Sequence, residues 1–137
     1  MPRIEEDCRL IDLPKIRDPR GNLTFVEGGR HIPFDIKRAF WIYDVPGGEM
    51  RGRHAYRRNR EIIIAVSGSF DVEVDNGNGT TRYQLNRSYC GLYLPPLHWR
   101  SILNFSTNSL CLILASEKYD VTDYIRDYEE FYRIREK

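Results

Sequence analysis

The chain has 137 residues, of which 21 are lysine or arginine and 20 are aspartate or glutamate, so its formal net charge at pH 7 is +1. A chain of this length predicts one domain, 1–137, which buries about two-thirds of its unfolded surface. The near-neutral charge balance argues against nucleic acid or an anionic membrane as the partner.

The three cysteines, Cys8, Cys90 and Cys111, are an odd number and lack a metal-binding spacing. We therefore expect reduced thiols rather than a disulfide framework. The amino-terminal residues contain no apolar run typical of a signal peptide, and no later stretch reaches the length of a membrane span. These features predict a cytoplasmic protein without membrane association.

Most of the chain shows the pattern of short β-strands separated by glycine and proline turns. The predicted strands cover residues 8–13, 23–27, 36–43, 61–66, 70–75, 81–85, 90–94, 99–103 and 110–115. Strands 70–75 and 81–85 are expected to form a hairpin, because the residues between them include Asn76-Gly77-Asn78-Gly79, which favour a tight turn.

Only the end of the chain has helical spacing. Apolar and aromatic residues recur at positions 121, 124, 125, 128, 131 and 132, with Thr122 or Asp123 available as the N-cap. We interpret this stripe as core packing rather than as a ligand platform. The pattern as a whole predicts an all-β fold, a sandwich or jelly-roll barrel with a short C-terminal α-helix.

One polar stretch has a motif spacing. From Gly48 to Gly68 the sequence reads G-x5-H-x-Y-x4-E-x6-G, in which His54, Tyr56 and Glu61 are the polar members. This spacing resembles the first signature motif of the cupin barrels, which normally carry a second histidine where this chain has Tyr56. The resemblance implies a cupin jelly-roll barrel.

Four segments narrow the resemblance to one family. They are DPRGNL (18–23), IKRAFWIYD (36–44), RGRHAY (51–56) and ASEKYDVTDYIRDY (115–128). Together they resemble the WxcM-like, FdtA-type sugar-nucleotide 3,4-ketoisomerases over nearly the whole chain, although that family typically reads R-G-x-H-A-H. The resemblance implies a homodimer whose amino-terminal strands are exchanged or packed across subunits.

The resemblance also implies a reaction. The family moves the carbonyl of dTDP-4-keto-6-deoxyglucose from C4 to C3 through an enediol, without a cofactor, in deoxysugar biosynthesis for surface polysaccharide. Such chemistry requires a base, a proton donor and groups that stabilise the enediolate oxygen. Two alternatives remain open: a 3,5-epimerase-type enzyme acting on a related dTDP-sugar, and a non-catalytic sugar-nucleotide-binding cupin.

The second cupin motif, P-x-G-x2-H-x3-N, bears on metal binding. Residues 95–104 read PPLHWRSILN, so Arg100 takes the position of the ligand histidine. With Tyr56 and Arg100 at two of the four ligand positions, only His54 and Glu61 remain, and an arginine repels a divalent cation. We predict that the site holds no metal and no other cofactor.

Three residues of the first motif are the predicted catalytic groups. His54 is the expected base, because an imidazole of near-neutral pKa can take a carbon-bound proton and return it. Tyr56 lies two residues on, on the same strand face, and either relays a proton or only orients the substrate. Arg51 is expected to stabilise enediolate charge or hold the substrate.

The substrate-binding prediction draws on arginines and aromatic residues. Arg38 is flanked by apolar residues, so we expect it either to bind the diphosphate or to form an ion pair with Asp44 or Glu61. The resemblance implies that Arg20 and Arg100 come near the sugar ring, and aromatic rings are expected to stack on the nucleobase. The full predicted set is Arg20, Arg38, Trp41, Tyr43, Arg57, Glu61, Trp99 and Arg100.

Overall fold

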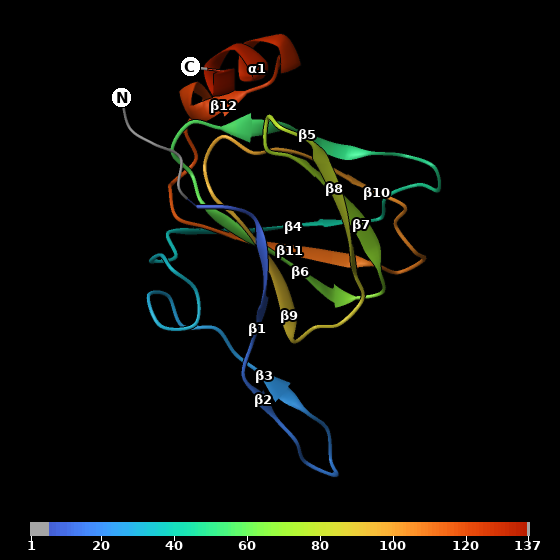
Figure 1. Cartoon of the computed structure of the whole chain (residues 1–137). Coiled ribbons are helices and arrows are strands. Elements are labelled where there is room, and N and C mark those ends of the chain that lie inside the picture. Colours follow the sequence, from blue (N-terminus) through green and yellow to red (C-terminus); the bar gives the residue numbers. More distant parts are fainter. Residues whose placement is uncertain (1–5, 137) are drawn as a thin grey trace.

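Antiparallel strands form two five-stranded sheets that face each other and enclose a barrel (Figure 1). The computed structural model describes residues 6–136. The first sheet has the order β1-β9-β6-β11-β4 and comprises β1 (Arg9–Asp12), β9 (Cys90–Leu94), β6 (Glu61–Ser67), β11 (Leu110–Ala115) and β4 (Arg38–Tyr43). The second sheet has the order β12-β5-β10-β7-β8 and comprises β12 (Tyr124–Ile125), β5 (Arg51–Tyr56), β10 (Trp99–Leu103), β7 (Phe70–Asp75) and β8 (Thr80–Leu85).

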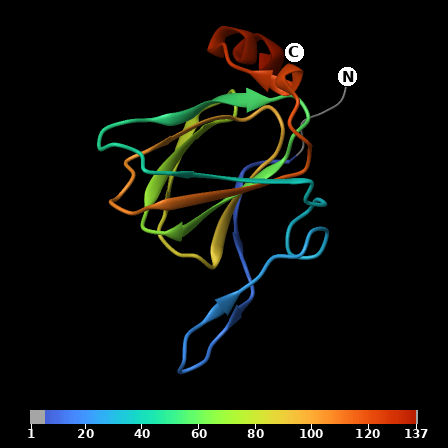
Figure 2. The ribbon, with the colours of Figure 1, turned by 180° about the vertical axis from the view of Figure 1, so that it is seen from behind.

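Three further elements lie outside the barrel wall. β2 (Lys15–Ile16) pairs with β3 (Leu23–Thr24) in a hairpin that projects away from the barrel (Figure 1). A 3-10 turn over Val121–Asp123 leads into β12, and α1 (Tyr128–Glu136) follows it. Figure 2 shows from behind that α1 and the projecting hairpin lie at opposite ends of the molecule.

The barrel interior is filled by side chains from both sheets. Alternate residues of each strand face inward, so apolar residues two apart along a strand share the core. The buried members are Ile63, Ala65, Phe70, Val72, Val74, Leu85, Leu92, Leu94, Ile102, Cys111 and Ile113. This apolar packing occupies the middle of the barrel and leaves polar residues of β5, β6 and β10 near one end.

The outer faces of both sheets are covered by separate apolar clusters. Leu13, Ile32 and Phe34, from the segment before β4, pack on Ile62 and Tyr93 of the first sheet. On the second sheet, Ala55, Trp99 and Ile125 pack against Phe131 of α1. The helix therefore fixes β12 and the neighbouring end of β5 in place.

The predicted strands agree with the structure along most of the chain. The hairpin of β7 and β8 forms across the predicted turn, where the amide of Asn76 donates to the carbonyl of Gly79 over 3.2 Å. Three strands are shorter than predicted. Residues 8–13 contribute β1 (Arg9–Asp12), residues 23–27 contribute only β3, and the aromatic strand begins at Arg38 rather than at residue 36.

The predicted helix is wrong in its first half. Thr122 and Asp123 belong to the 3-10 turn, and residues 124–125 form β12, which pairs with β5. The helix begins only at Tyr128, where the carboxylate of Asp127 accepts a hydrogen bond from the amide of Glu129. The interpretation of the stripe as core is also wrong in part, because Val121, Tyr128 and Tyr132 are exposed.

Two predictions about the chain as a whole can be compared with the described residues. The three cysteines are free, although only Cys111 is fully buried. Between residues 6 and 136, no helix combines the length and the apolar character needed to cross a membrane.

Candidate active site

His54 and Tyr56 lie side by side on the inner face of β5. Their ring centroids are 4.7 Å apart, and the ring of Tyr124 on the adjacent β12 lies 4.9 Å from His54 and 4.8 Å from Tyr56. Both β5 side chains are buried. His54 Nε2 and the hydroxyl of Tyr56 have no hydrogen-bond partner among residues 6–136. Such unsatisfied buried groups are rare in folded proteins and mark this cluster as a candidate site.

The surroundings of these two residues keep both uncharged. Burial, and then the positive charges of Arg100, Arg126 and Arg38, lower the pKa of His54 from 6.5 to about 2. The near-neutral pKa expected for His54 is therefore wrong for this site, because the imidazole is buried among cations. Burial and the negative charge of Glu61 raise the pKa of the Tyr56 phenol above its ordinary value, and Arg100 opposes this shift only partly. At neutral pH the cluster therefore contains a neutral imidazole, which can accept a proton, beside a neutral phenol, which can donate one.

Glu61 and Arg100 form a buried ion pair beside this cluster. Arg100 Nε and Nη2 donate to the two carboxylate oxygens of Glu61 over 2.8 and 3.2 Å, and Nη1 donates to the carbonyl of Gly52 over 2.7 Å. Although burial favours the neutral guanidine, the charge of Glu61 outweighs it and raises the pKa of Arg100. Each partner is 1% exposed, so the pair crosses the barrel interior from β10 to β6 without contact with solvent.

Gly52 makes room for this arrangement. Its φ of +70° is in the left-handed region, and the β5–β10 register shifts between the pairs Arg100–His54 and Ile102–Arg51. A Cβ atom at position 52 would overlap Arg100 Nη1. The register shift is a β-bulge, and it points the carbonyl of Gly52 at the guanidinium of Arg100. Any side chain at position 52 would collide with that guanidinium.

The ion pair fills two positions at which metal-binding cupins have ligands. Within residues 6–136, no three histidine, cysteine, aspartate or glutamate side chains are grouped so that they could hold a metal ion. Arg38 forms no ion pair with Asp44 or Glu61, so that alternative for Arg38 is wrong.

Four side chains form a rim around the His54–Tyr56 cluster, which we call the arginine–tyrosine rim: Arg38, Tyr119, Tyr124 and Arg126. The guanidinium carbon of Arg38 lies 5.7 Å from the ring centre of Tyr119, whose ring lies 5.7 Å from that of Tyr124. The guanidinium carbon of Arg126 lies 4.4 Å from the ring centre of Tyr124. The rim thus links β4 of the first sheet to β12 of the second.

A buried carboxylate holds the rim segment against the barrel. Asp123 accepts hydrogen bonds from the backbone amides of Arg58 over 2.7 Å and of Asn59 over 3.1 Å. The side chain of Arg58 also donates to Asp120 over 2.9 Å. The loop between β5 and β6 thereby fixes residues 120–123, and with them the positions of the neighbouring rim residues.

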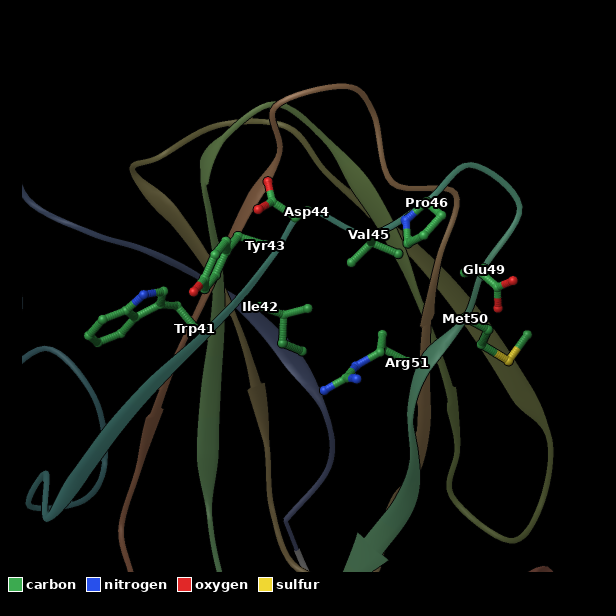
Figure 3. A pocket seen from close by; sticks show the side chains of 9 residues that line it. All are labelled: Trp41, Ile42, Tyr43, Asp44, Val45, Pro46, Glu49, Met50 and Arg51. Atoms are coloured by element: carbon green, nitrogen blue, oxygen red, sulfur yellow. The ribbon is translucent and has the colours of Figure 1, made fainter.

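A cleft opens between the end of β4 and the start of β5. It has a volume of about 440 Å³, in the range of small-ligand sites, and its lining includes Trp41, Tyr43 and Arg51. Figure 3 shows the side chain of Arg51 extending from β5 toward Ile42 of β4. His54 does not line this cleft, but it lies three residues along the strand that Arg51 begins.

The remaining predicted site residues lie elsewhere in the described chain. Arg57 pairs with Glu130 of α1 over 3.0 Å, at the surface. Trp99 faces the outer side of β10, where its ring packs 5.8 Å from Phe131. Arg20 lies at the tip of the projecting hairpin and pairs with Asp18 over 2.9 Å, with its side chain 89% exposed.

Sequence reasoning missed Tyr119, Tyr124 and Arg126 as site residues. All three lie in the segment 115–128, which carried part of the family resemblance, but helical periodicity assigned Tyr124 to the core-packing stripe and singled out neither Tyr119 nor Arg126. Residues 124–125 are extended and pair with β5, a partner that no local pattern in the sequence indicates.

Comparisons with known proteins agree with this architecture. Residues 6–136 match the family model described as WxcM-like, C-terminal (FdtA). A TDP-4-oxo-6-deoxy-alpha-D-glucose-3,4-oxoisomerase from Aneurinibacillus thermoaerophilus is 39% identical over 123 residues, which are 90% of this chain and 88% of the relative.

Two solved structures are closely similar. One is a His-to-Asn mutant of the 3,4-ketoisomerase QdtA from Thermoanaerobacterium thermosaccharolyticum in complex with TDP-4-keto-6-deoxyglucose. It has a TM-score of 0.93 and 35% identity, and the match covers 95% of this chain and 94% of that one. The other is the WlaRB TDP-quinovose 3,4-ketoisomerase from Campylobacter jejuni, with a TM-score of 0.89 and 39% identity. The match covers 93% of this chain and 98% of that one. These similarities confirm the predicted cupin-type jelly-roll barrel.

Proposed function

This chain belongs to the WxcM-like, C-terminal family (FdtA), and from that membership we propose that it is a TDP-sugar 3,4-ketoisomerase. Its substrate is a dTDP-linked 4-keto-6-deoxyhexose, dTDP-4-keto-6-deoxyglucose, and its product is the 3-keto isomer. A solved relative at 35% identity binds TDP-4-keto-6-deoxyglucose, which supports this substrate. The likeness spans 95% of the chain, so it includes the whole barrel.

One observation carries the proposal. His54 Nε2 and the Tyr56 hydroxyl are buried without hydrogen-bond partners among the described residues, on rings 4.7 Å apart. A keto sugar has a carbonyl oxygen and a neighbouring hydroxyl, and these groups can satisfy both atoms. Because an unpaired buried polar group costs about 1–3 kcal/mol, the free site favours a ligand that supplies the missing partners.

The arrangement supports acid–base catalysis. His54 removes the proton from C3, and the electron pair of that C–H bond forms the C3–C4 double bond while the C4 oxygen takes a proton from Tyr56. The resulting enediol then gives its O3 proton to the Tyr56 oxygen, and C4 takes back the proton held by His54. The carbonyl is then at C3, and both side chains have returned to their starting states.

Charged groups beside the cluster stabilise the intermediates. Arg100 lies 5.9 Å from the ring centre of Tyr56, so its charge favours the transient phenolate. Arg51 borders the cleft between β4 and β5 and supplies a second cation for the enediolate or for the nucleotide. The buried pair of Glu61 and Arg100 supports a site that works without a metal or other cofactor.

The nucleotide portion occupies the cleft between β4 and β5. Trp41 and Tyr43 line it and offer exposed rings for the base. Arg57 and Trp99 already have partners within the chain, so their part in binding is to brace α1 and β10 around the site. The protein acts as one domain in the cytoplasm, which its three free thiols support.

A homodimer accounts for the position of Arg20. This residue lies on the hairpin that projects away from its own barrel, and Ile16 and Leu23 on the same hairpin are each 54% exposed. Apolar residues on a projecting element favour a partner surface. In the proposed dimer the hairpin packs on the second subunit and brings Arg20 to the sugar site of that subunit.

The test is proton NMR of dTDP-4-keto-6-deoxyglucose with EDTA-treated protein in deuterated buffer. The expected result is a carbonyl moved to C3, with the His54→Asn variant as the inactive control. Exchange at C3 and C5 with the carbonyl still at C4 would instead identify an epimerase. An unchanged spectrum with demonstrable TDP binding would identify a non-catalytic binding protein.

A further inference from the structure

A second cleft lies on the outer face of the sheet whose inner face carries His54 and Tyr56. It has a volume of about 300 Å³, at the lower end of the range for small-ligand sites, and β5, β7, β8, β10 and α1 all contribute to its lining. Side chains alternate between the two faces of a strand, so Arg53, next to His54, points outward. The thickness of the sheet therefore separates this cleft from the catalytic cluster.

The register of the strands brings the polar lining residues together. Ser101 of β10 lies opposite Glu73 of β7. Asp75, two residues further along β7, lies opposite Thr80 of β8. The β-bulge of β5 leaves Arg53 as an extra residue opposite Ser101, and bulges commonly re-aim a side chain next to a site. Four neighbouring strands thus direct charged and hydroxyl groups into one cleft.

Two polar atoms in this cleft lack partners within the described chain. Ser101 is 7% exposed, yet its hydroxyl forms no hydrogen bond with any residue in the range 6–136. Arg82 donates only to Oε2 of Glu73, over 2.6 and 3.2 Å, and Oε1 accepts no hydrogen bond from that range. A hydroxyl can donate one hydrogen bond and accept two, and a nearly buried polar group without partners is rare. A ligand in the cleft can supply the missing partners.

The charges around the cleft are balanced. Glu73 is paired with Arg82, while Arg53 and Asp75 contribute one charge of each sign. Asp75 also accepts a hydrogen bond from the Tyr128 hydroxyl over 2.5 Å, which fixes the orientation of the carboxylate. A diphosphate or a polycation would meet as much repulsion as attraction here. The lining therefore favours a neutral ligand that both donates and accepts hydrogen bonds.

An aromatic ring forms one wall of the cleft. Tyr128 is 39% exposed at the start of α1, and its ring packs edge-on against Trp99 with centroids 5.4 Å apart. This contact and the hydrogen bond to Asp75 hold the ring in place, and part of its apolar surface stays open to a ligand. A sugar ring combines an apolar C–H face with hydroxyl groups, so it matches both the aromatic wall and the polar side chains.

We propose that this outer cleft binds a neutral sugar ring. The hydroxyl groups of the sugar bond to Ser101, Glu73 and Arg53, and its C–H face rests on Tyr128. The occupant is a free monosaccharide or the terminal unit of a glycan chain, because both present the same ring to the cleft. This site is distinct from the proposed ketoisomerase site, and its occupancy does not require turnover.

The first test is a titration of isotope-labelled protein, followed through the NMR shifts of its backbone amides. The neutral probes are methyl α-D-glucopyranoside, methyl α-L-rhamnopyranoside and maltotriose, and glucose 1-phosphate tests the effect of charge. We expect at least one neutral probe to shift the amides of Thr80 and Ser101 saturably, with a Kd in the millimolar range. No such shift with any neutral probe, or shifts confined to residues 41–51 of the other cleft, would overturn the proposal.

The probes also separate the two sources of the sugar. Equal affinity for maltotriose and the methyl glucoside supports a free monosaccharide, whereas roughly tenfold tighter binding of maltotriose supports a glycan chain. Glucose 1-phosphate should bind no tighter than the methyl glucoside, because the charges of the cleft are balanced. An affinity for glucose 1-phosphate that is about tenfold higher would contradict the assignment of a neutral ligand.

The second test uses Ser101→Ala and Arg53→Gln, with Arg87→Gln as the matched control in the exposed turn between β8 and β9. Each of the first two variants should bind the probe about fivefold to tenfold more weakly, which corresponds to the loss of one hydrogen bond. Arg87→Gln should bind like the wild type. Ser101→Ala should also keep the wild-type free energy of unfolding in urea, which separates ligand binding from a structural role. Unchanged affinity in both cleft variants would contradict the proposal.

This proposal and the ketoisomerase function can fail separately. Ser101→Ala retains the whole catalytic cluster, so it should turn over dTDP-4-keto-6-deoxyglucose like the wild type. A protein that turns over this substrate while its outer cleft binds none of the neutral probes contradicts only the sugar-binding site.

Discussion

Among single residues, His54 couples the site to the stability of the fold. Its pKa in the folded protein is about 2, below the ordinary 6.5 that it regains on unfolding. The unfolded chain therefore binds a proton that the folded chain rejects. The stability associated with His54 is complete above pH 6.5 and is lost as the pH falls below that value.

This linkage predicts a measurable difference between the wild type and His54→Asn. Relative to the variant, the wild type should lose about 1 kcal/mol of unfolding free energy between pH 6 and pH 5, as determined by urea denaturation. The contribution of the carboxylates to the pH dependence cancels in this difference, because they titrate in both proteins. The same variant should lose roughly a hundredfold or more in turnover, the usual contribution of a general base. A pH-independent difference would show that folding does not lower the pKa of His54.

Gly52 gives a second prediction at this scale. Gly52→Ala places a Cβ against Arg100 Nη1 and also forces alanine into a left-handed backbone conformation. We expect the free energy of unfolding, measured by urea denaturation, to fall by about 3 kcal/mol, the sum of backbone strain and a displaced charged hydrogen bond. Gly48→Ala is the matched control, because its φ is +84° but nothing lies within 4 Å of the added Cβ. Equal losses in the two variants would mean that Arg100 moves aside without cost.

The sequence predicts some of these residue contacts and not others. His54 and Tyr56 share a strand face because side chains alternate with a period of two, which requires only local information. The pairing of Glu61 with Arg100 depends on two strands from opposite sheets, 39 residues apart in the chain. Spacing placed both residues at cupin ligand positions, but it gave no indication that they bind each other.

At the scale of elements, the segment that joins β11 to α1 builds one side of the site. Its helical periodicity predicted a helix capped at Thr122 or Asp123, yet residues 124–125 pair with the free edge of β5. Backbone hydrogen bonds to a partner strand outweigh a weak local helix preference. The β-strands were predicted well because their turns and alternation are local, whereas the partner of this segment is about 70 residues away in sequence.

Helix α1 should stabilise this segment through one side chain. Phe131 is completely buried and contacts Trp99. Phe131→Ala should therefore lower the free energy of unfolding, measured by urea denaturation, by about 3–5 kcal/mol. Trp99 should then become more exposed and its fluorescence should shift to the red, while Trp41, 56% exposed, already emits as a solvated indole. Tyr132→Ala, at a half-exposed neighbour, should change little. An unshifted emission in Phe131→Ala would mean that α1 stays docked without this contact.

At the scale of the whole molecule, the proposed dimer makes each site depend on two chains. Arg20→Ala and His54→Asn should each lack turnover as pure proteins. A remixed sample should regain about a quarter of wild-type activity, because half of the dimers are mixed and each of these has one complete site. If the mixture stays inactive while sedimentation confirms exchange of subunits, Arg20 does not act across the interface.

The sequence could place Arg20 only through family resemblance, since no local pattern reveals a contact with another chain.

The buried pair of Glu61 and Arg100 also constrains how this barrel can evolve. Replacing Arg100 alone by a histidine would leave Glu61 as an uncompensated charge in the interior, at a cost of about 3–5 kcal/mol, before any metal site is complete. That amount is a large share of the stability of an ordinary domain. A metal site at these positions would therefore require Glu61 and Arg100 to change together, because each single substitution passes through a strongly destabilised protein.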